Sequence, residues 1–198
     1  MFLIKELNQS EPYKLFERKF NEALDSDQKN INAIAISSLS KEKMEVDSRF
    51  VNLKYIVNDE WFFFTNYNSP KAKEFEEHNQ ISALLYWNKI DTQIRIKAKI
   101  KKADTSFSDN HFSSRSKGKN ALAICSDQSK NLISYEDLRN DFKNTLSNSD
   151  VYKRPEYWGG FSFEPYSFEF WEGEENRLNR RTLYKKVDRE WNRSFLQP

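Results

Sequence analysis

Residues 155–181 read PEYWGGFSFEPYSFEFWEGEENRLNRR, and they hold the strongest β-strand signal in the chain. The Trp-Gly-Gly-Phe start predicts a turn that leads into an aromatic strand. Alternating phenylalanines lie on both sides of Pro165, at positions Phe161, Phe163, Phe168 and Phe170. Pro165 is expected to break this run, because proline has no N–H for the strand ladder.

The same segment ends with Trp171 and a group of arginines between residues 177 and 181. This predicts a flat apolar face beside several cations, which suits a planar anionic ligand. A β-sandwich core followed by a solvated basic loop explains the same residues, so the segment alone leaves both interpretations open.

Composition limits the class of protein. The 198 residues predict a single domain, with residues 1–10 as a flexible arm. Net charge is +2, so no nucleic-acid partner is expected, although lysines alternate along residues 97–101. The lone Cys125 permits no internal disulfide and favours a reducing, cytoplasmic setting. Neither a membrane span nor a metal cluster is expected, because long apolar runs and ligand-type spacings are missing from the sequence.

Hydrophobic periodicity predicts strands separated by blocks of helix. Helices are expected at residues 11–25, 70–78, 105–116, 119–125 and 134–146. Ser10 or Glu11 can cap the first of these, and Ser134-x-x-Asp137 has the form of a capping box at the start of the last. Strands are expected at residues 31–38, 49–57, 61–66, 80–87, 91–103, 182–187 and 190–196, in addition to the aromatic run. Because helices and strands do not alternate regularly, we expect a mainly β fold (α+β), an antiparallel barrel with peripheral helices.

Two local patterns indicate an anion site. In the strand expected at 49–57, Arg49 and Lys54 point to opposite faces, and each is either a site residue or a strand-end cation in water. Ser69, Pro70 and Lys71 predict the start of a helix. The free N–H groups of that helix end, with a lysine beside them, favour a phosphate.

A series of short motifs, taken in order, resembles the pyridoxamine 5′-phosphate oxidase family from about Glu11 to Pro198. The motifs are PYKLFERKF, RFVNLK, FFFTN, SPKAKEF, SALLYW, TQIRI, FSSRS, SDQS, WGGF, EFWEG, NRLNRR and the terminal LQP. The resemblance implies an FMN-binding split β-barrel that forms a homodimer with FMN at its interface. It also implies oxidation of pyridoxamine or pyridoxine 5′-phosphate to pyridoxal 5′-phosphate, with O₂ as electron acceptor.

The resemblance assigns roles to individual positions. FMN contacts are implied for Arg49, Phe50, Val51, Asn52, Leu53, Lys54, Phe64, Thr65, Pro70, Lys71, Gln93, Gln128, Ser129, Trp171 and Arg181. Among these, Arg49, Lys71 and Ser129 would hold the FMN phosphate. The substrate phosphate would be bound by Lys54, His111, Arg115 and Lys119, while Arg177 and Asn179 would lie over the substrate ring as catalytic residues.

The sequence departs from the family pattern at several of these positions. Pro70 and Thr92 stand where the family usually has arginine, and Asn179 stands where it has histidine. His111 and Lys119 replace a tyrosine and a serine among the substrate-phosphate ligands. Most of the site departures fall on the substrate side, so two alternatives stay open. One is an FMN oxidase with another substrate, of the phenazine-biosynthesis type, and the other is a non-catalytic protein that binds flavin or pyridoxal phosphate.

Overall fold

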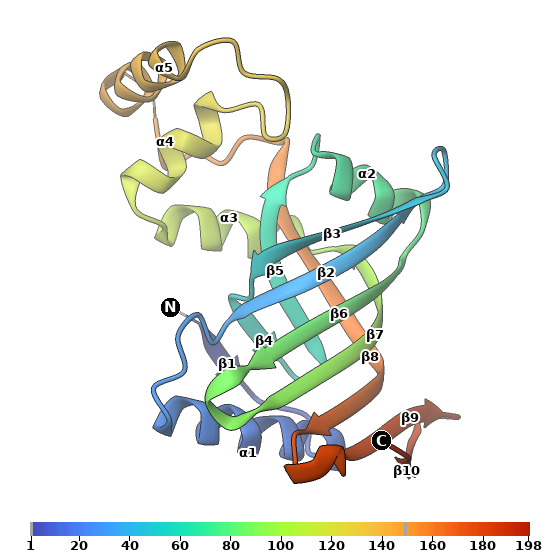
Figure 1. Ribbon diagram of the computed structural model, residues 1–198. Coiled ribbons are helices and arrows are strands. Elements are labelled where there is room, and N and C mark those ends of the chain that lie inside the picture. The colour runs from blue at the N-terminus through green and yellow to red at the C-terminus, as the bar shows by residue number, and fades with distance from the viewer. Residues whose placement is uncertain (1, 149) are drawn as a thin grey trace.

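The computed structural model describes residues 2–148 and 150–198 and shows one curled sheet with helices at its two ends (Figure 1). The strands are β1 (Leu3–Lys5), β2 (Ala33–Ser40), β3 (Glu45–Asn52), β4 (Tyr55–Val57), β5 (Glu60–Asn66), β6 (Gln80–Trp87), β7 (Thr92–Lys102), β8 (Trp158–Glu172), β9 (Arg180–Val187) and β10 (Glu190–Leu196). The helices are α1 (Glu11–Asp25), α2 (Pro70–Glu77), α3 (Thr105–Ser114), α4 (Lys117–Cys125) and α5 (Tyr135–Asn148), with single 3₁₀ turns η1 (Asn88–Ile90) and η2 (Glu175–Arg177).

The sheet runs in the order β1-β4-β5-β8-β7-β6-β2-β3, and β9 joins β8 to β10. Each of these pairings is antiparallel except that between β1 and β4. The prediction of a mainly β fold with peripheral helices is confirmed. In the described part of the chain, no helix is both long enough and apolar enough to cross a membrane.

The central strand β8 differs from its prediction, because Pro165 does not break it. One edge of β8 pairs with β5 as far as Phe163 and with β9 from Ser167 onward. Pro165 lies between these two partners, where its missing N–H leaves no ladder bond unmade. On the other edge, Lys97 pairs with Ser167 and Ala98 with Pro165, so Tyr166 is an extra residue in a β-bulge.

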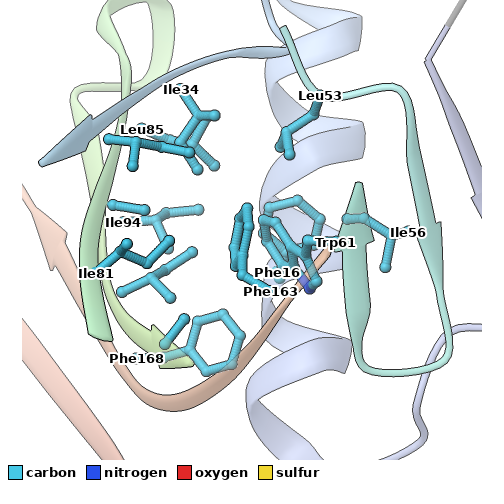
Figure 2. Close-up of a cluster of buried hydrophobic side chains, with 14 of the residues drawn as sticks. Phe16, Ile34, Leu53, Ile56, Trp61, Ile81, Leu85, Ile94, Phe163 and Phe168 are labelled. Atoms are coloured by element: carbon cyan, nitrogen blue, oxygen red, sulfur yellow. The ribbon is translucent and has the colours of Figure 1, made fainter. Parts of the chain in front are cut away.

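This bulge explains how the aromatic run fills the core. The phenylalanines before Pro165 have odd numbers and those after it have even numbers, so strict alternation would place them on opposite faces. The extra residue changes the phase, and all four side chains are buried, with exposures of 0–1% for Phe161, Phe163, Phe168 and Phe170. Figure 2 shows Phe163 and Phe168 among aliphatic side chains from several strands, with Phe16 of α1 beside Trp61.

The Trp-Gly-Gly sequence is also strand rather than a turn, since β8 begins at Trp158 itself. Gly159 is required by close packing: a Cβ atom there would lie 2.1 Å from the hydroxyl oxygen of Tyr67. That hydroxyl donates to the carbonyl of Gly160 at 3.1 Å. The glycines therefore allow the Tyr67 ring to lie against β8.

Three further predictions are corrected. The expected arm contains β1, which is fixed to β4 by parallel pairing; residue 1 of that arm lies outside the described residues. The strand expected at 49–57 is interrupted after Asn52, where Leu53 turns into the core. The sequence also predicts a charged hairpin loop at 39–47, and the hairpin is present but its loop is shorter, because β2 and β3 pair as far as Ser40 and Glu45.

The two ends of the barrel carry different helices. Helices α3, α4 and α5 lie at the end where β5 finishes and β8 begins, whereas α1, β9 and β10 lie at the opposite end (Figure 1). The predicted helix starts are confirmed at Ser10, Ser69 and Ser134, each of which directly precedes a helix. Ser134 accepts from the N–H groups of Glu136 and Asp137, as its capping sequence predicts.

Candidate functional site

A cleft of about 610 Å³ opens at the end of the barrel that carries α3 and α4. Strands β3, β4 and β5 form its floor, and residues from α2, α3 and α4 close its sides. Its lining includes the predicted site residues Phe50, Val51, Asn52, Lys54, Phe64, Thr65, Lys71, His111, Arg115, Lys119 and Gln128. No described residue that lines the cleft is acidic, so the cleft is a cationic site.

Lys71 is the most buried of the cleft cations, with 8% of the residue exposed. Its Nζ donates to the hydroxyls of Thr65 and Ser69, each at 3.3 Å, and it forms no ion pair in the described part of the chain. Burial lowers the pKa of Lys71, and the charge of Arg49 lowers it further, although Glu74 opposes them. A buried ammonium with only hydroxyl partners favours an anion next to it.

Arg49 lies behind the cleft wall, between β3 and α2. Its guanidinium NH2 is 3.1 Å from the carboxylate of Glu74, and its NH1 donates to the hydroxyl of Ser38. Ser38 donates to the same carboxylate at 2.5 Å, and Glu74 is only 5% exposed. The charge of Arg49 is therefore compensated by a buried carboxylate. Arg49 is neither a strand-end cation in water nor a binding-site cation without a partner.

Arg115 and Lys54 provide the charge on the α3 side. The Arg115 guanidinium lies 4.4 Å from the ring centroid of Trp158, a cation–π contact, and its buried NH1 has no hydrogen-bond partner in the described structure. Burial lowers the pKa of Arg115 to about 10. The pKa of Lys54 is lowered by burial and then by Lys119 and Arg115. Burial and mutual repulsion disfavour the charged forms of these side chains, and a bound anion would stabilise them. Such a cluster of cations is a candidate anion site.

His111 lies in the same wall, on α3. Its ring stacks on Phe64 with 3.7 Å between centroids, and its Nδ1 is 2.8 Å from the hydroxyl oxygen of Tyr55. Burial lowers its pKa to about 4, with further lowering by Arg115, Lys54 and Lys119. His111 is therefore neutral at pH 7.

Gln128 connects the α4–α5 loop to β5. Its side-chain oxygen accepts from the hydroxyl of Thr65 and from the N–H of Asn66, both at 3.1 Å. The next residue, Ser129, has a left-handed backbone (φ 69°) and lines a neighbouring groove instead of this cleft. Leu53 is 1% exposed in the core, and both its backbone polar groups are bonded to Asn32, so it contributes packing and not ligand contacts.

Pro70 begins α2, next to Lys71, and the remaining predicted residues lie at the opposite end of the barrel. Gln93, Trp171 and Arg181 are neighbours across β7, β8 and β9. The Arg181 guanidinium donates to Glu169 at 2.7 and 2.9 Å. Arg177 is exposed at the end of η2 with a left-handed backbone, and the Asn179 side chain accepts from the N–H of Glu174 at 3.3 Å.

The two groups are too far apart to contact one small ligand within a subunit. Trp158 begins β8 beside the cleft, and Trp171 lies near its other end. At about 3.3 Å per residue, this separation is roughly 40 Å along the strand. The residues gathered by the cleft, and those around Trp171, are therefore two separate surfaces of one chain.

Several site residues were not identified from the sequence. Glu74 gave no signal, because a glutamate in a helix is ordinary until β3 brings Arg49 to it. Tyr55 follows Lys54 directly, and the strand pattern predicts only which face of the strand its side chain occupies. Trp158 was assigned to a turn, although an aromatic residue beside a predicted phosphate ligand such as Arg115 is a recognisable partner once the strands are paired.

The fold and the cleft define a β-barrel protein with a cationic cleft at one end. A pyridoxine/pyridoxamine 5′-phosphate oxidase from Aliarcobacter butzleri is 37% identical over 98% of this chain and 92% of the relative. One from Legionella pneumophila is 34% identical over 99% and 92%. The chain belongs to the pyridoxine/pyridoxamine 5′-phosphate oxidase family and is an oxidoreductase of that type. Residues 158–198 also match a family model described as the pyridoxine 5′-phosphate oxidase C-terminal dimerisation region.

Solved structures confirm the split β-barrel. PhzG from Burkholderia lata, in complex with tetrahydrophenazine-1-carboxylic acid, is 29% identical, with a TM-score of 0.90 over 96% of this chain and 93% of that one. A pyridoxamine 5′-phosphate oxidase-related, FMN-binding protein from Nostoc punctiforme has a TM-score of 0.79 at 13% identity, covering 96% and 99% of the two chains. The second likeness concerns the fold alone.

Proposed function

We propose that this protein is an FMN-dependent oxidase that converts pyridoxamine or pyridoxine 5′-phosphate to pyridoxal 5′-phosphate with O₂ as electron acceptor. The observation that carries the proposal is the acid-free cleft, in which the cations Lys54, Lys71, Arg115 and Lys119 face one space. A flavin phosphate and a phosphorylated substrate together bring the negative charge that this space lacks.

The residues present fit FMN. Lys71 and Arg49 would hold its phosphate near the start of α2, where free N–H groups add to the attraction. The loss of an arginine at Pro70 leaves these two cations in place. Thr65 and Gln128 would contact the ribityl chain and ring from β5 and the α4–α5 loop, and Ser129 would reach the phosphate only after its loop moves.

The second group of residues would complete the site from a partner subunit. A dimer built through residues 158–198 would present Gln93, Trp171 and Arg181 to the partner's cleft. Gln93 has an amide that can both donate to and accept from the polar edge of a flavin. Arg177 and Asn179 would then reach the substrate ring from the same subunit.

Each group of residues has its own part in turnover. Bound FMN supplies the redox chemistry, accepting a hydride from the substrate and passing electrons to O₂. Lys54, Arg115 and Lys119 bind and orient the substrate phosphate, and Arg177 covers the ring and excludes water. Asn179 can donate or accept a hydrogen bond but cannot take up or release a proton near pH 7.

Subunit complementation tests this arrangement. Arg115→Ala removes a cleft cation, and Arg177→Ala removes a residue of the opposite end, so each homodimer is expected to be nearly inactive. When the two variants are co-expressed, mixed dimers contain one site with both surfaces intact, and about a quarter of the wild-type oxygen uptake returns. If activity does not return although mixed dimers form, both residues serve a site within one subunit.

A second candidate keeps the flavin and changes the substrate. It is favoured by the 0.90 TM-score to PhzG, whose complex contains a carboxylic acid instead of a phosphate ester. Anaerobic mixing separates the candidates, because bleaching of the flavin band by pyridoxine 5′-phosphate supports the first and bleaching only by a dihydro- or tetrahydrophenazine carboxylate supports the second. A yellow protein bleached by neither is a binding protein, and a colourless protein that takes up no FMN removes both oxidases.

A further inference from the structure

His111 is held in a fixed orientation at the edge of the cleft. Phe64 covers one face of its ring, and the ring of Tyr55 meets it edge-on with 5.4 Å between centroids. The Tyr55 hydroxyl is 2.8 Å from Nδ1, so that nitrogen is already engaged. Nε2 has no protein partner in the described part of the chain. Because His111 lines the cleft, an N–H at Nε2 is available to an anion there.

The charges around this imidazole are all positive. Arg115 faces it from the junction between α3 and α4, Lys119 from the first turn of α4, and Lys54 from the segment between β3 and β4. From β1, the ammonium of Lys5 lies 5.8 Å from the Tyr55 ring. Burial and the three facing cations keep the pKa of His111 near 4, and burial also raises the pKa of Tyr55. At neutral pH, His111 is therefore a neutral imidazole hydrogen-bonded to the protonated phenol of Tyr55.

We propose that His111 takes up one proton when a dianion binds among Lys54, Arg115 and Lys119, so that the site selects phosphate esters over carboxylates. The incoming charge cancels the positive field that keeps the ring neutral. An opposite charge within about 4–6 Å moves a pKa by about 1–3, and a dianion supplies two such charges. A carboxylate supplies one and produces a smaller change.

Tyr55 allows both protonation states without movement of the ring. In the neutral state its hydroxyl donates to Nδ1, while the Nε2 proton points to the ligand. When the ring gains a proton from solvent at Nδ1, that N–H donates to the Tyr55 oxygen, and the hydroxyl proton turns away. Tyr55 is a positioning residue in this scheme, and His111 is the residue that distinguishes dianions from monoanions.

The inference rests on the proposed function for the identity of the ligand, but its test needs neither flavin nor turnover. The chain has two histidines, His78 and His111, so NMR of the imidazole C–H groups resolves both. Sulfate is the probe, because it stays dianionic between pH 4 and 8, and formate is the monoanion control. Saturating sulfate should raise the pKa of His111 by about 2 and formate by less, with no response of His78. The proposal is overturned if sulfate leaves the His111 titration unchanged, or raises it no more than formate does.

Matched variants provide a second readout. Sulfate affinity of the wild type should rise several-fold from pH 7.5 to 5.5, and His78→Gln should behave in the same way. His111→Gln should bind sulfate with an affinity that hardly changes with pH. Tyr55→Phe keeps the ring packing but removes the hydrogen-bond partner, and should reduce the rise. If FMN binding fails while His111 still responds to sulfate, the proposed oxidase is wrong and this inference stands; the reverse pattern removes only the inference.

Discussion

Arg49 and Glu74 form an ion pair of 3.1 Å between β3 and α2, directly behind the cleft. Glu74 is nearly fully buried, so this carboxylate sets the orientation of the guanidinium. Lys71, three residues earlier on α2, forms no such pair in the described structure. A phosphate that enters the cleft would therefore meet Lys71, an uncompensated cation, directly, with the compensated Arg49 behind it.

Replacing Glu74 by glutamine tests this difference. Glu74→Gln removes the buried carboxylate and leaves Arg49 only the exposed Asp47, 3.9 Å away, so we expect the melting temperature of the FMN-free protein to fall by several degrees. FMN would then replace the lost negative charge and raise the melting temperature more in the variant than in the wild type. Thermal unfolding with and without FMN measures both effects. Glu77→Gln, on an exposed site of the same helix, is the control and should change neither value.

Arg177→Ala separates catalysis from cofactor binding. Arg177 is exposed at the far end of the barrel and has no contact with the cleft of its own chain. We expect turnover to fall about 10²-fold or more while FMN affinity changes less than threefold. Steady-state oxygen uptake measures turnover, and a flavin fluorescence titration measures FMN affinity. Lys185→Ala, at an exposed position of β9, is the control. Equal losses of turnover and FMN affinity would contradict the assigned role.

Asn179→His tests whether this position has lost a general acid–base group. The Asn179 side chain accepts from the N–H of Glu174, which a histidine nitrogen can also do. We expect oxidase activity to rise, by about 10-fold if general acid–base catalysis is regained. The pH–rate profile would then gain a limb near the pKa of an ordinary histidine. An unchanged rate would show that the position tolerates either residue.

His111 also makes stability depend on pH. Its pKa is lowered to about 4 in the folded protein, whereas an unfolded histidine titrates near 6.5. The unfolded chain therefore binds a proton that the folded chain rejects, and stability falls as pH drops from about 7 towards 4. Without added anions, the melting temperature should fall less between pH 7.5 and 5 in His111→Gln than in the wild type. Equal falls would show that His111 titrates normally in the fold.

Gly159→Ala should destabilise the barrel by about 1–3 kcal/mol, because the methyl group added to β8 would overlap the ring of Tyr67, which packs against this strand. Gly118 provides a matched control in α4, where the nearest atom to an added Cβ is 3.8 Å away. Gly118→Ala should be neutral or stabilise by up to about 1 kcal/mol. Denaturant unfolding of both variants measures the difference. Equal effects would contradict the packing explanation of Gly159.

Most helices and strands could be predicted because their signals, alternation and capping, lie within a few neighbouring residues. The alternation of Ile94, Ile96, Ala98 and Ile100 gave β7, and all four are buried. The capping sequence at Ser134 gave the start of α5. β1 was missed because it pairs with β4, far along the chain, and the interruption after Asn52 was missed because β3 and β4 pair with different strands, β2 and β5.

The candidate site was predicted as a set of positions and not as an arrangement. The cleft gathers Lys54, Lys71, His111, Arg115 and Lys119, as the resemblance implied. The sequence did not predict which side chains contact these site residues. Nothing in it distinguishes Glu74, Tyr55 or Trp158 from other residues of the same type. Partners of this kind are determined only when the strands are brought into register.

The bulge at Tyr166 has a consequence for the evolution of this chain. Trp158 and Trp171 are an odd number of positions apart, and the extra residue places both tryptophans on the face of β8 opposite the four buried phenylalanines. Deletion of a single codon after Pro165 would therefore turn Trp171 inward and expel two phenylalanines at once. Insertions and deletions in β8 should survive only in compensating pairs, so its length should vary less among descendants of this gene than the length of the loops around it.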